Sequence, residues 1–149
     1  MKTIRIAILC LGVTTKCFSQ SEVTAIRKTI EAEDIAFYTN PNRKAYMEYW
    51  AIKPDTRWVY SGLDGTVIMT ASDLKTAIAK NQFPPADNSV CSFSNFVIKV
   101  NGTVGWATYD KKAVAPKGKT DYTHEFRGME KIAGVWKIIS ASVHQYKPK

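Results

Sequence analysis

The sequence has little cysteine, and two of its three cysteines lie close to the N-terminus. Cys10 and Cys17 fall within the first 19 residues, and Cys91 is the third. A chain that keeps only Cys91 cannot form an intrachain disulfide, so its fold must depend on packing alone. Cys91 lies in the alternating stretch VCSFSNFVIKV. We therefore interpret it as a small buried residue of a strand rather than as a nucleophile.

Histidine is also scarce, and the motifs of several enzyme classes are missing. His124 and His144 are the only two histidines, and together with Cys91 they do not supply a structural zinc set. The sequence has no glycine-rich phosphate loop and no serine in a nucleophile-elbow context. These absences disfavour metal, nucleotide and covalent-serine chemistry, and we expect no cofactor.

No apolar run approaches the roughly 20 residues that a membrane-spanning helix needs, so we expect no membrane insertion. Residues 1–19 instead combine Lys2 and Arg5, an apolar stretch over 6–13, and the small Ser19. This pattern is typical of a secretory signal peptide. It predicts export to the periplasm or beyond, and a single domain over residues 20–149.

The remaining charge does not indicate a nucleic-acid partner. The formal net charge of +8 falls to +5 without Lys2, Arg5 and Lys16. The basic residues are dispersed, whereas phosphate binding needs them clustered. The densest run, KKAVAPKGK over 111–119, contains Pro and Gly and is interpreted as a solvated hairpin loop.

Three helices are predicted in the first half of the chain. Residues 21–39 place Val23, Ile26, Ile30 and Phe37 on one stripe, with Ser21 as a possible cap. A short helix follows, with Asn40 as its cap and its end near Pro54. A strand pair is expected in 56–70, and a third helix in 71–83, capped by Ser72.

From residue 90 the apolar pattern changes to a period of two, which predicts strands. The four predicted strands are Val90–Val100, Val104–Lys112, Tyr122–Lys131 and Val135–Gln145. Asn101-Gly102 indicates a type I′ hairpin turn, and Ala133-Gly134 serves the last hairpin. Helices that precede a mostly antiparallel sheet predict an α+β domain.

Several motifs together resemble one superfamily. They are AFYTN, RKAYMEYWA, RWVYSG, GTVGWATYD and EFRGMEKIAGVWKI. The chain is similar to nuclear transport factor 2-like proteins, specifically small exported SnoaL-like members. The resemblance implies a cystatin-like cone, in which a curved antiparallel sheet packed by three N-terminal helices encloses a funnel, and a homodimer formed through the sheet. The superfamily includes enzymes, binding proteins and dimerisation modules, so the fold does not select a function.

Strand alternation selects candidate funnel residues. Along the last strand, the alternation places Trp136 and His144 on the same face. Glu125 and Arg127 share a side of the preceding strand, and the resemblance suggests that this side faces inward. Arg127 could bind a substrate carboxylate or carbonyl, with Glu125 orienting it or acting as a base; the alternative is a purely structural ion pair. His124 has the opposite parity and is expected to be exposed.

Aromatic residues provide a candidate hydrophobic wall. Trp58 and Tyr60 share a strand face, and Trp50 and Tyr109 lie in neighbouring predicted elements, although such residues are often simply core. Asp55 is either a pocket carboxylate or a surface cap. The predicted ligand-binding set is therefore Trp50, Asp55, Trp58, Tyr60, Tyr109, Glu125, Arg127 and His144.

Three functions remain open from the sequence. The first is a funnel that binds a small, partly hydrophobic organic molecule. The second is a cofactor-free lyase, isomerase or cyclase in which Glu125, Arg127 and His144 transfer protons. The third is a structural dimerisation module whose funnel is filled by its own aromatic residues.

Overall fold

The computed structural model describes residues 14–41 and 43–148, with their side chains from Gln20 onward. Helix α1 (Thr14–Thr39) includes the end of the segment expected to be a signal peptide, and the rest of that segment lies outside the described residues. None of the helices in the described part of the chain is both long and apolar enough to cross a membrane.

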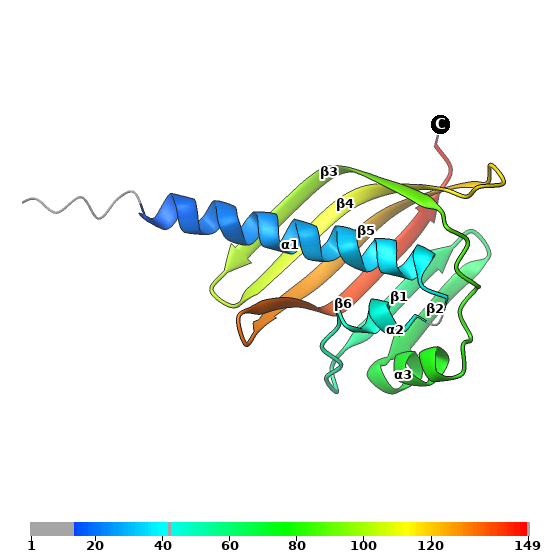
Figure 1. Ribbon diagram of the computed structural model, residues 1–149, viewed down its shortest axis with the longest axis horizontal. Coiled ribbons are helices and arrows are strands. Elements are labelled where there is room, and N and C mark those ends of the chain that lie inside the picture. The colour runs from blue at the N-terminus through cyan, green and yellow to red at the C-terminus, as the bar shows by residue number, and fades with distance from the viewer. Residues whose placement is uncertain (1–13, 42, 149) are drawn as a thin grey trace, which may run out of the picture.

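Six strands form one open sheet in the order β2-β1-β6-β5-β4-β3 (Figure 1). Their bounds are Arg57–Gly62 for β1, Gly65–Thr70 for β2, Val90–Asn101 for β3, Val104–Val114 for β4, Thr120–Ile132 for β5 and Val135–Tyr146 for β6. The four predicted long strands are confirmed, each one to three residues longer overall than expected. The sheet is mixed rather than wholly antiparallel, because β1 pairs with β6 in parallel.

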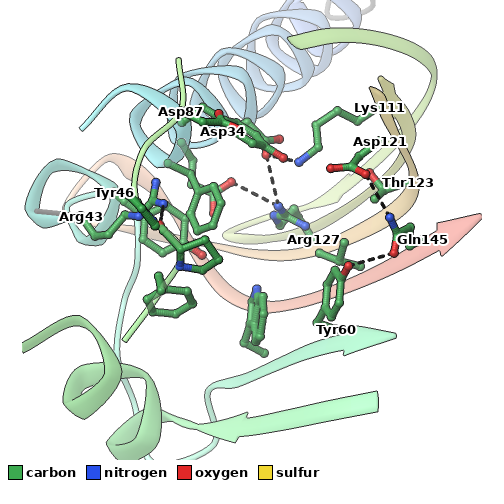
Figure 2. Close-up of a pocket in the computed structure, with 18 of the residues that line it drawn as sticks. Asp34, Arg43, Tyr46, Tyr60, Asp87, Lys111, Asp121, Thr123, Arg127 and Gln145 are labelled. Carbon is green, nitrogen blue, oxygen red and sulfur yellow. Dashed lines mark hydrogen bonds and ion pairs between the residues drawn. The ribbon is translucent and has the colours of Figure 1, made fainter. Parts of the chain in front are cut away.

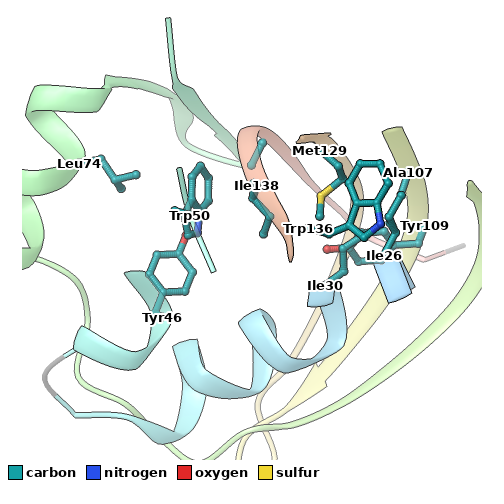
Figure 3. Packing of buried hydrophobic residues seen from close by; sticks show 11 residues of the cluster. Ile26, Ile30, Tyr46, Trp50, Leu74, Ala107, Tyr109, Met129, Trp136 and Ile138 are labelled. Atoms are coloured by element: carbon teal, nitrogen blue, oxygen red, sulfur yellow. The ribbon is translucent and has the colours of Figure 1, made fainter. Parts of the chain in front are cut away.

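Helix α1 crosses one face of the sheet and supplies one side of the core (Figure 1). Ile26 and Ile30 on the predicted apolar stripe are fully buried. Figure 3 shows both beside Met129 and Trp136. Tyr46 and Trp50, which follow α1 in the sequence, lie on the other side of Ile138. Within residues 14–41 and 43–148, no helix packs on the opposite face of the sheet.

The other two helices are shorter than predicted. Helix α2 spans only Lys44–Met47, and α3 spans Ala71–Ala79 beside β1 and β2. Thr70, not Ser72, caps α3, because its hydroxyl accepts from the backbone of Asp73 while the Asp73 carboxylate accepts from the backbone N–H of Thr70. Beyond α3, the segment 80–89 runs from the β1–β2 side of the sheet to its other edge, where β3 begins (Figure 1).

One predicted hairpin turn is confirmed and the other is displaced by one residue. Ala133 and Gly134 both have positive φ, at 48° and 83°, as a type I′ turn requires. In the first hairpin Asn101 pairs with Val104, so the turn residues are Gly102 and Thr103. Gly102, with φ of 59°, supplies the left-handed residue there.

A bulge in the last hairpin overturns the prediction that Trp136 and His144 share a face. The pairing of β5 with β6 passes from Gly128↔Ser140 to Met129↔Ile138, so Ile139 is an extra residue on β6. One extra residue reverses the alternation beyond it. Trp136 is consequently buried, whereas His144 is exposed on the face away from α1.

Candidate functional site

A cavity of about 380 Å³ lies between the inner face of the sheet, the C-terminal half of α1 and the segment that follows α3. Figure 2 shows the lining side chains, with Arg43 and Tyr46 at one end and Tyr60 and Gln145 at the other. The volume is within the range of small-molecule sites.

Aromatic side chains form one wall of the cavity. Trp58 and Tyr60 of β1 stack with 6.0 Å between ring centroids and 9° between ring planes. Phe83 meets Trp58 edge-on at 6.0 Å, and Phe37 of α1 meets Phe83 in the same way. This wall offers flat apolar surfaces to a ligand.

The floor of the cavity carries a cluster of buried charges, which we call the charged cluster: Glu33, Asp34, Lys111, Glu125 and Arg127. Lys111 Nζ lies 2.5 Å from Asp34 Oδ1 and 2.7 Å from Glu125 Oε1. Arg127 Nη2 lies 2.8 Å from Glu125 Oε2 and 3.3 Å from Glu33 Oε2. All five side chains are almost wholly buried, so water screens these interactions very little.

Neutral side chains add hydrogen bonds to the carboxyl groups of the charged cluster. The Tyr109 hydroxyl lies 3.1 Å from Asp34 Oδ2 and 3.0 Å from Glu125 Oε2, and Thr123 donates to Glu125 Oε1 at 2.6 Å. Trp50 Nε1 donates to Glu33 at 3.1 Å. The carboxylates are therefore held by partners from β4, β5 and the residues that follow α2.

The charged cluster has three carboxyl groups but only two cations, and this excess of carboxyl groups helps to raise the pKa of Glu33. Burial, opposed by Arg127 and reinforced by the neighbouring Asp34 and Glu125, raises the pKa of Glu33 to about 7. Burial also raises the pKa of Asp34. Burial acts the same way on Glu125, but Lys111 and Arg127 outweigh it and lower that pKa to about 2. Glu33 therefore changes its protonation near neutral pH while Glu125 stays ionised.

The rim near Tyr60 is held by a chain of polar contacts. The Tyr60 hydroxyl donates to Gln145 Oε1 at 3.1 Å, and Gln145 Nε2 donates to Asp121 Oδ1 at 3.1 Å. Lys119 lies 3.3 Å from the same Asp121 carboxylate. These contacts link β1, β6 and the start of β5 at the cavity mouth.

The structure brings most of the predicted ligand-binding residues together, in two layers. Trp58, Tyr60 and Arg127 line the cavity directly. Glu125 and Tyr109 lie beneath its floor, and Trp50 contacts the floor through Glu33. Arg127 is already paired with two carboxylates, which limits the substrate-binding role expected of it.

Two predicted residues are not part of the site. Asp55 is exposed in the turn before β1 and does not line the cavity. His144 lies on the outer face, where its Nε2 is 2.8 Å from Ser142 Oγ, and it cannot transfer protons inside the cavity. His124 is also outside, as predicted, beside Asp110. Cys91 is only half-buried, and burial raises the pKa of its thiol to about 12, which disfavours a nucleophilic thiolate.

Sequence reasoning missed four central charged residues: Glu33, Asp34, Arg43 and Lys111. The two acids follow Ile26 and Ile30 on the same helical stripe, so their positions carried a signal. Lys111 was assigned to a solvated loop, but β4 continues to Val114 and buries it. Arg43, in the irregular stretch before α2, lies in no periodic pattern.

Comparisons with solved structures identify the fold. A cystatin-like protein of unknown function from Nostoc punctiforme is 14% identical, with a TM-score of 0.65 over 83% of this chain and 90% of that one. An NTF2-like protein of unknown function from Shewanella oneidensis is 16% identical, with a TM-score of 0.66 over 83% and 98%. The chain has the nuclear transport factor 2-like fold. This confirms the predicted fold class.

A provisionally named ketosteroid isomerase from Parabacteroides distasonis has the same fold at 20% identity, with a TM-score of 0.60 over 80% of this chain and 86% of that one. No family profile matches the sequence, and no curated protein is significantly similar to it. At these identities the nuclear transport factor 2-like fold is shared, but no activity is transferred by it.

Proposed function

We propose that the cavity binds a small, partly hydrophobic organic molecule. The observation that supports this is the combination of an open volume of about 380 Å³, a stacked aromatic wall at Trp58 and Tyr60, and a polar floor at Arg127. Binding sites for small molecules are mostly apolar, with a few placed polar groups that fix orientation. The aromatic wall supplies contact area, and the floor recognises a polar group.

The test is a ligand-observed NMR screen of bicyclic aromatic compounds against three proteins. Val143 lines the cavity, so Val143→Phe reduces its volume without removing any member of the charged cluster. Ser142→Phe adds the same ring to the adjacent residue, which faces the other side of the sheet. We expect ligands of the wild type to bind Ser142→Phe and not Val143→Phe. A screen without ligands, or binding that Val143→Phe leaves unchanged, would refute the proposal.

A second candidate is acid–base catalysis, and Glu33 is the residue that favours it. Glu33 lines the cavity, and burial raises its pKa to about 7. A general base or acid is most effective when its pKa is near the working pH. This role differs from the sequence hypothesis, because Glu125 is held ionised beneath the floor and His144 is on the outer face. Turnover would follow a single ionisation near pH 7 and be abolished in Glu33→Gln.

We also propose that two copies associate through the outer face of the sheet and that the chain is exported. Trp106, Phe126 and Tyr146 have opposite parity to the cavity-lining residues of their strands and are 39%, 37% and 39% exposed. Exposed aromatic residues on this outer face favour an interface. Export rests on the signal-peptide pattern of residues 1–19.

A further inference from the structure

The two cavity-lining arginines have unsatisfied donors. Among the described residues, three buried side-chain nitrogens or oxygens lack a hydrogen-bond partner, namely Arg43 Nε, Arg43 Nη1 and Arg127 Nε. Leaving a buried polar group unpaired costs stability, and such groups are rare in native proteins. Both arginines line the same cavity, and the unpaired nitrogens themselves are buried in its wall.

The positive charge of Arg43 is less well neutralised than that of Arg127. Arg127 pairs with Glu33 and Glu125, whereas no carboxylate of the described residues forms an ion pair with Arg43. Its Nη2 donates to the Pro84 carbonyl and its guanidinium lies 4.0 Å from the centroid of the Phe37 ring, but neither contact neutralises the positive charge. Asp87 also lines the cavity, and its Oδ1 accepts hydrogen bonds from the backbone and hydroxyl of Ser89.

The backbone at Arg43 adds a second cost. Its φ is 56°, in the left-handed region that glycine occupies easily and arginine does not, and only 2% of the residue is exposed. A strained residue with a buried, unpaired charge is a feature that function explains better than stability does. Figure 2 places Arg43 at the end of the cavity away from Tyr60 and Gln145.

We propose that the ligand is an organic anion whose carboxylate is bound by Arg43. This inference rests on the proposed binding function and names the charge of the ligand. A guanidinium presents paired N–H donors that match a carboxylate. The charged cluster cannot play this part, because its carboxyl groups outnumber its cations, and the aromatic wall at Trp58 and Tyr60 fits the apolar body of such a molecule.

The test compares 2-naphthoate with 2-naphthamide, which have the same ring system and differ in charge, by isothermal titration calorimetry. Because hydrogen bonds to charged groups are the stronger ones, we expect the wild type to bind the acid about 10- to 100-fold more tightly than the amide. Arg43→Gln should remove this preference by weakening the binding of the acid much more than that of the amide. Arg43→Lys, which keeps the charge, should retain part of it.

The outcomes separate the two proposals. Equal affinity for acid and amide in the wild type would overturn the assignment of an anion and leave the cavity as a binding site. A preference for the acid that survives in a folded Arg43→Gln would place the carboxylate elsewhere and overturn the role of Arg43. If neither compound binds, both this inference and the proposed function fail. The wild-type comparison needs no variant, so it decides the charge of the ligand even if Arg43→Gln does not fold.

Discussion

Glu33→Gln tests the electrostatics of the charged cluster directly, through the pH dependence of stability. Glu33 is fully buried, and its pKa is raised from 4.5 to about 7. A raised carboxyl pKa means that the unfolded chain releases this proton at lower pH than the folded protein does. The contribution of Glu33 to the free energy of unfolding of the wild type must therefore fall as pH rises from about 4.5 to about 7.

The size of the effect follows from the shift in pKa. One pKa unit corresponds to 1.36 kcal/mol, so a shift from 4.5 to about 7 amounts to about 3 kcal/mol, an order-of-magnitude value for a residue in a charged cluster. Glutamine keeps the shape of Glu33 but cannot ionise. Glu33→Gln should lower the free energy of unfolding by an amount that does not depend on pH, because it alters the contacts with Arg127 and Trp50. It should not show the further decrease in stability that the ionisation of Glu33 causes as the pH rises.

The assay is urea unfolding followed by tryptophan fluorescence, from about pH 5 to about pH 8. The free energy of unfolding of Glu33→Gln minus that of the wild type should rise across this range by up to about 3 kcal/mol. Glu31→Gln is the matched control, because Glu31 is a partly exposed carboxylate on the same helix. A flat difference for Glu33→Gln, or one that falls with pH, would refute the raised pKa of Glu33.

Three further outcomes are expected. Lys111→Met should lower the free energy of unfolding by about 3–5 kcal/mol, because it leaves buried carboxylates without their cation. Lys112→Met, at an exposed neighbour, should change it by less than about 0.5 kcal/mol. A similarly small effect of both variants in urea unfolding would contradict the ion pairs of Lys111 in the charged cluster. Gly105→Ala should cost about 1–3 kcal/mol in the same assay, because its Cβ would lie 2.9 Å from the Lys99 carbonyl oxygen; an unchanged midpoint would argue against that close approach. Phe126→Ser should shift a dimer toward monomer in light scattering after gel filtration, and an unaltered mass would disprove the proposed interface.

The sheet was predictable because its strands are long and each buries one face. Period-two alternation then fixes which residues share a side, as it did for Glu125 and Arg127. The same rule failed for His144, because it assumes an unbroken strand and a bulge at Ile139 leaves no mark in composition.

The site was only half predictable, for a physical reason. Trp58 and Tyr60 were found because aromatic residues on one strand face are a conspicuous pattern. Glu33 and Asp34 were overlooked because charge on a helix usually indicates the solvent face, whereas here it continues the apolar stripe. Arg43 is positioned by a single left-handed residue and by the proline-containing segment after α3, and neither follows from local periodicity.

The charged cluster also helps to choose between the functions that the sequence left open. Buried ion pairs contribute little net stability, because desolvation offsets their attraction, and apolar residues of similar volume often serve as well. A structural module with a funnel filled by its own aromatic residues has no need of three buried carboxyl groups at its floor. Nor would it retain a cavity of about 380 Å³ above them. The cost of burying Glu33 is understandable if this residue meets a ligand in the cavity, and the uncompensated charge of Arg43 in the same lining is suited to an anionic group of that ligand.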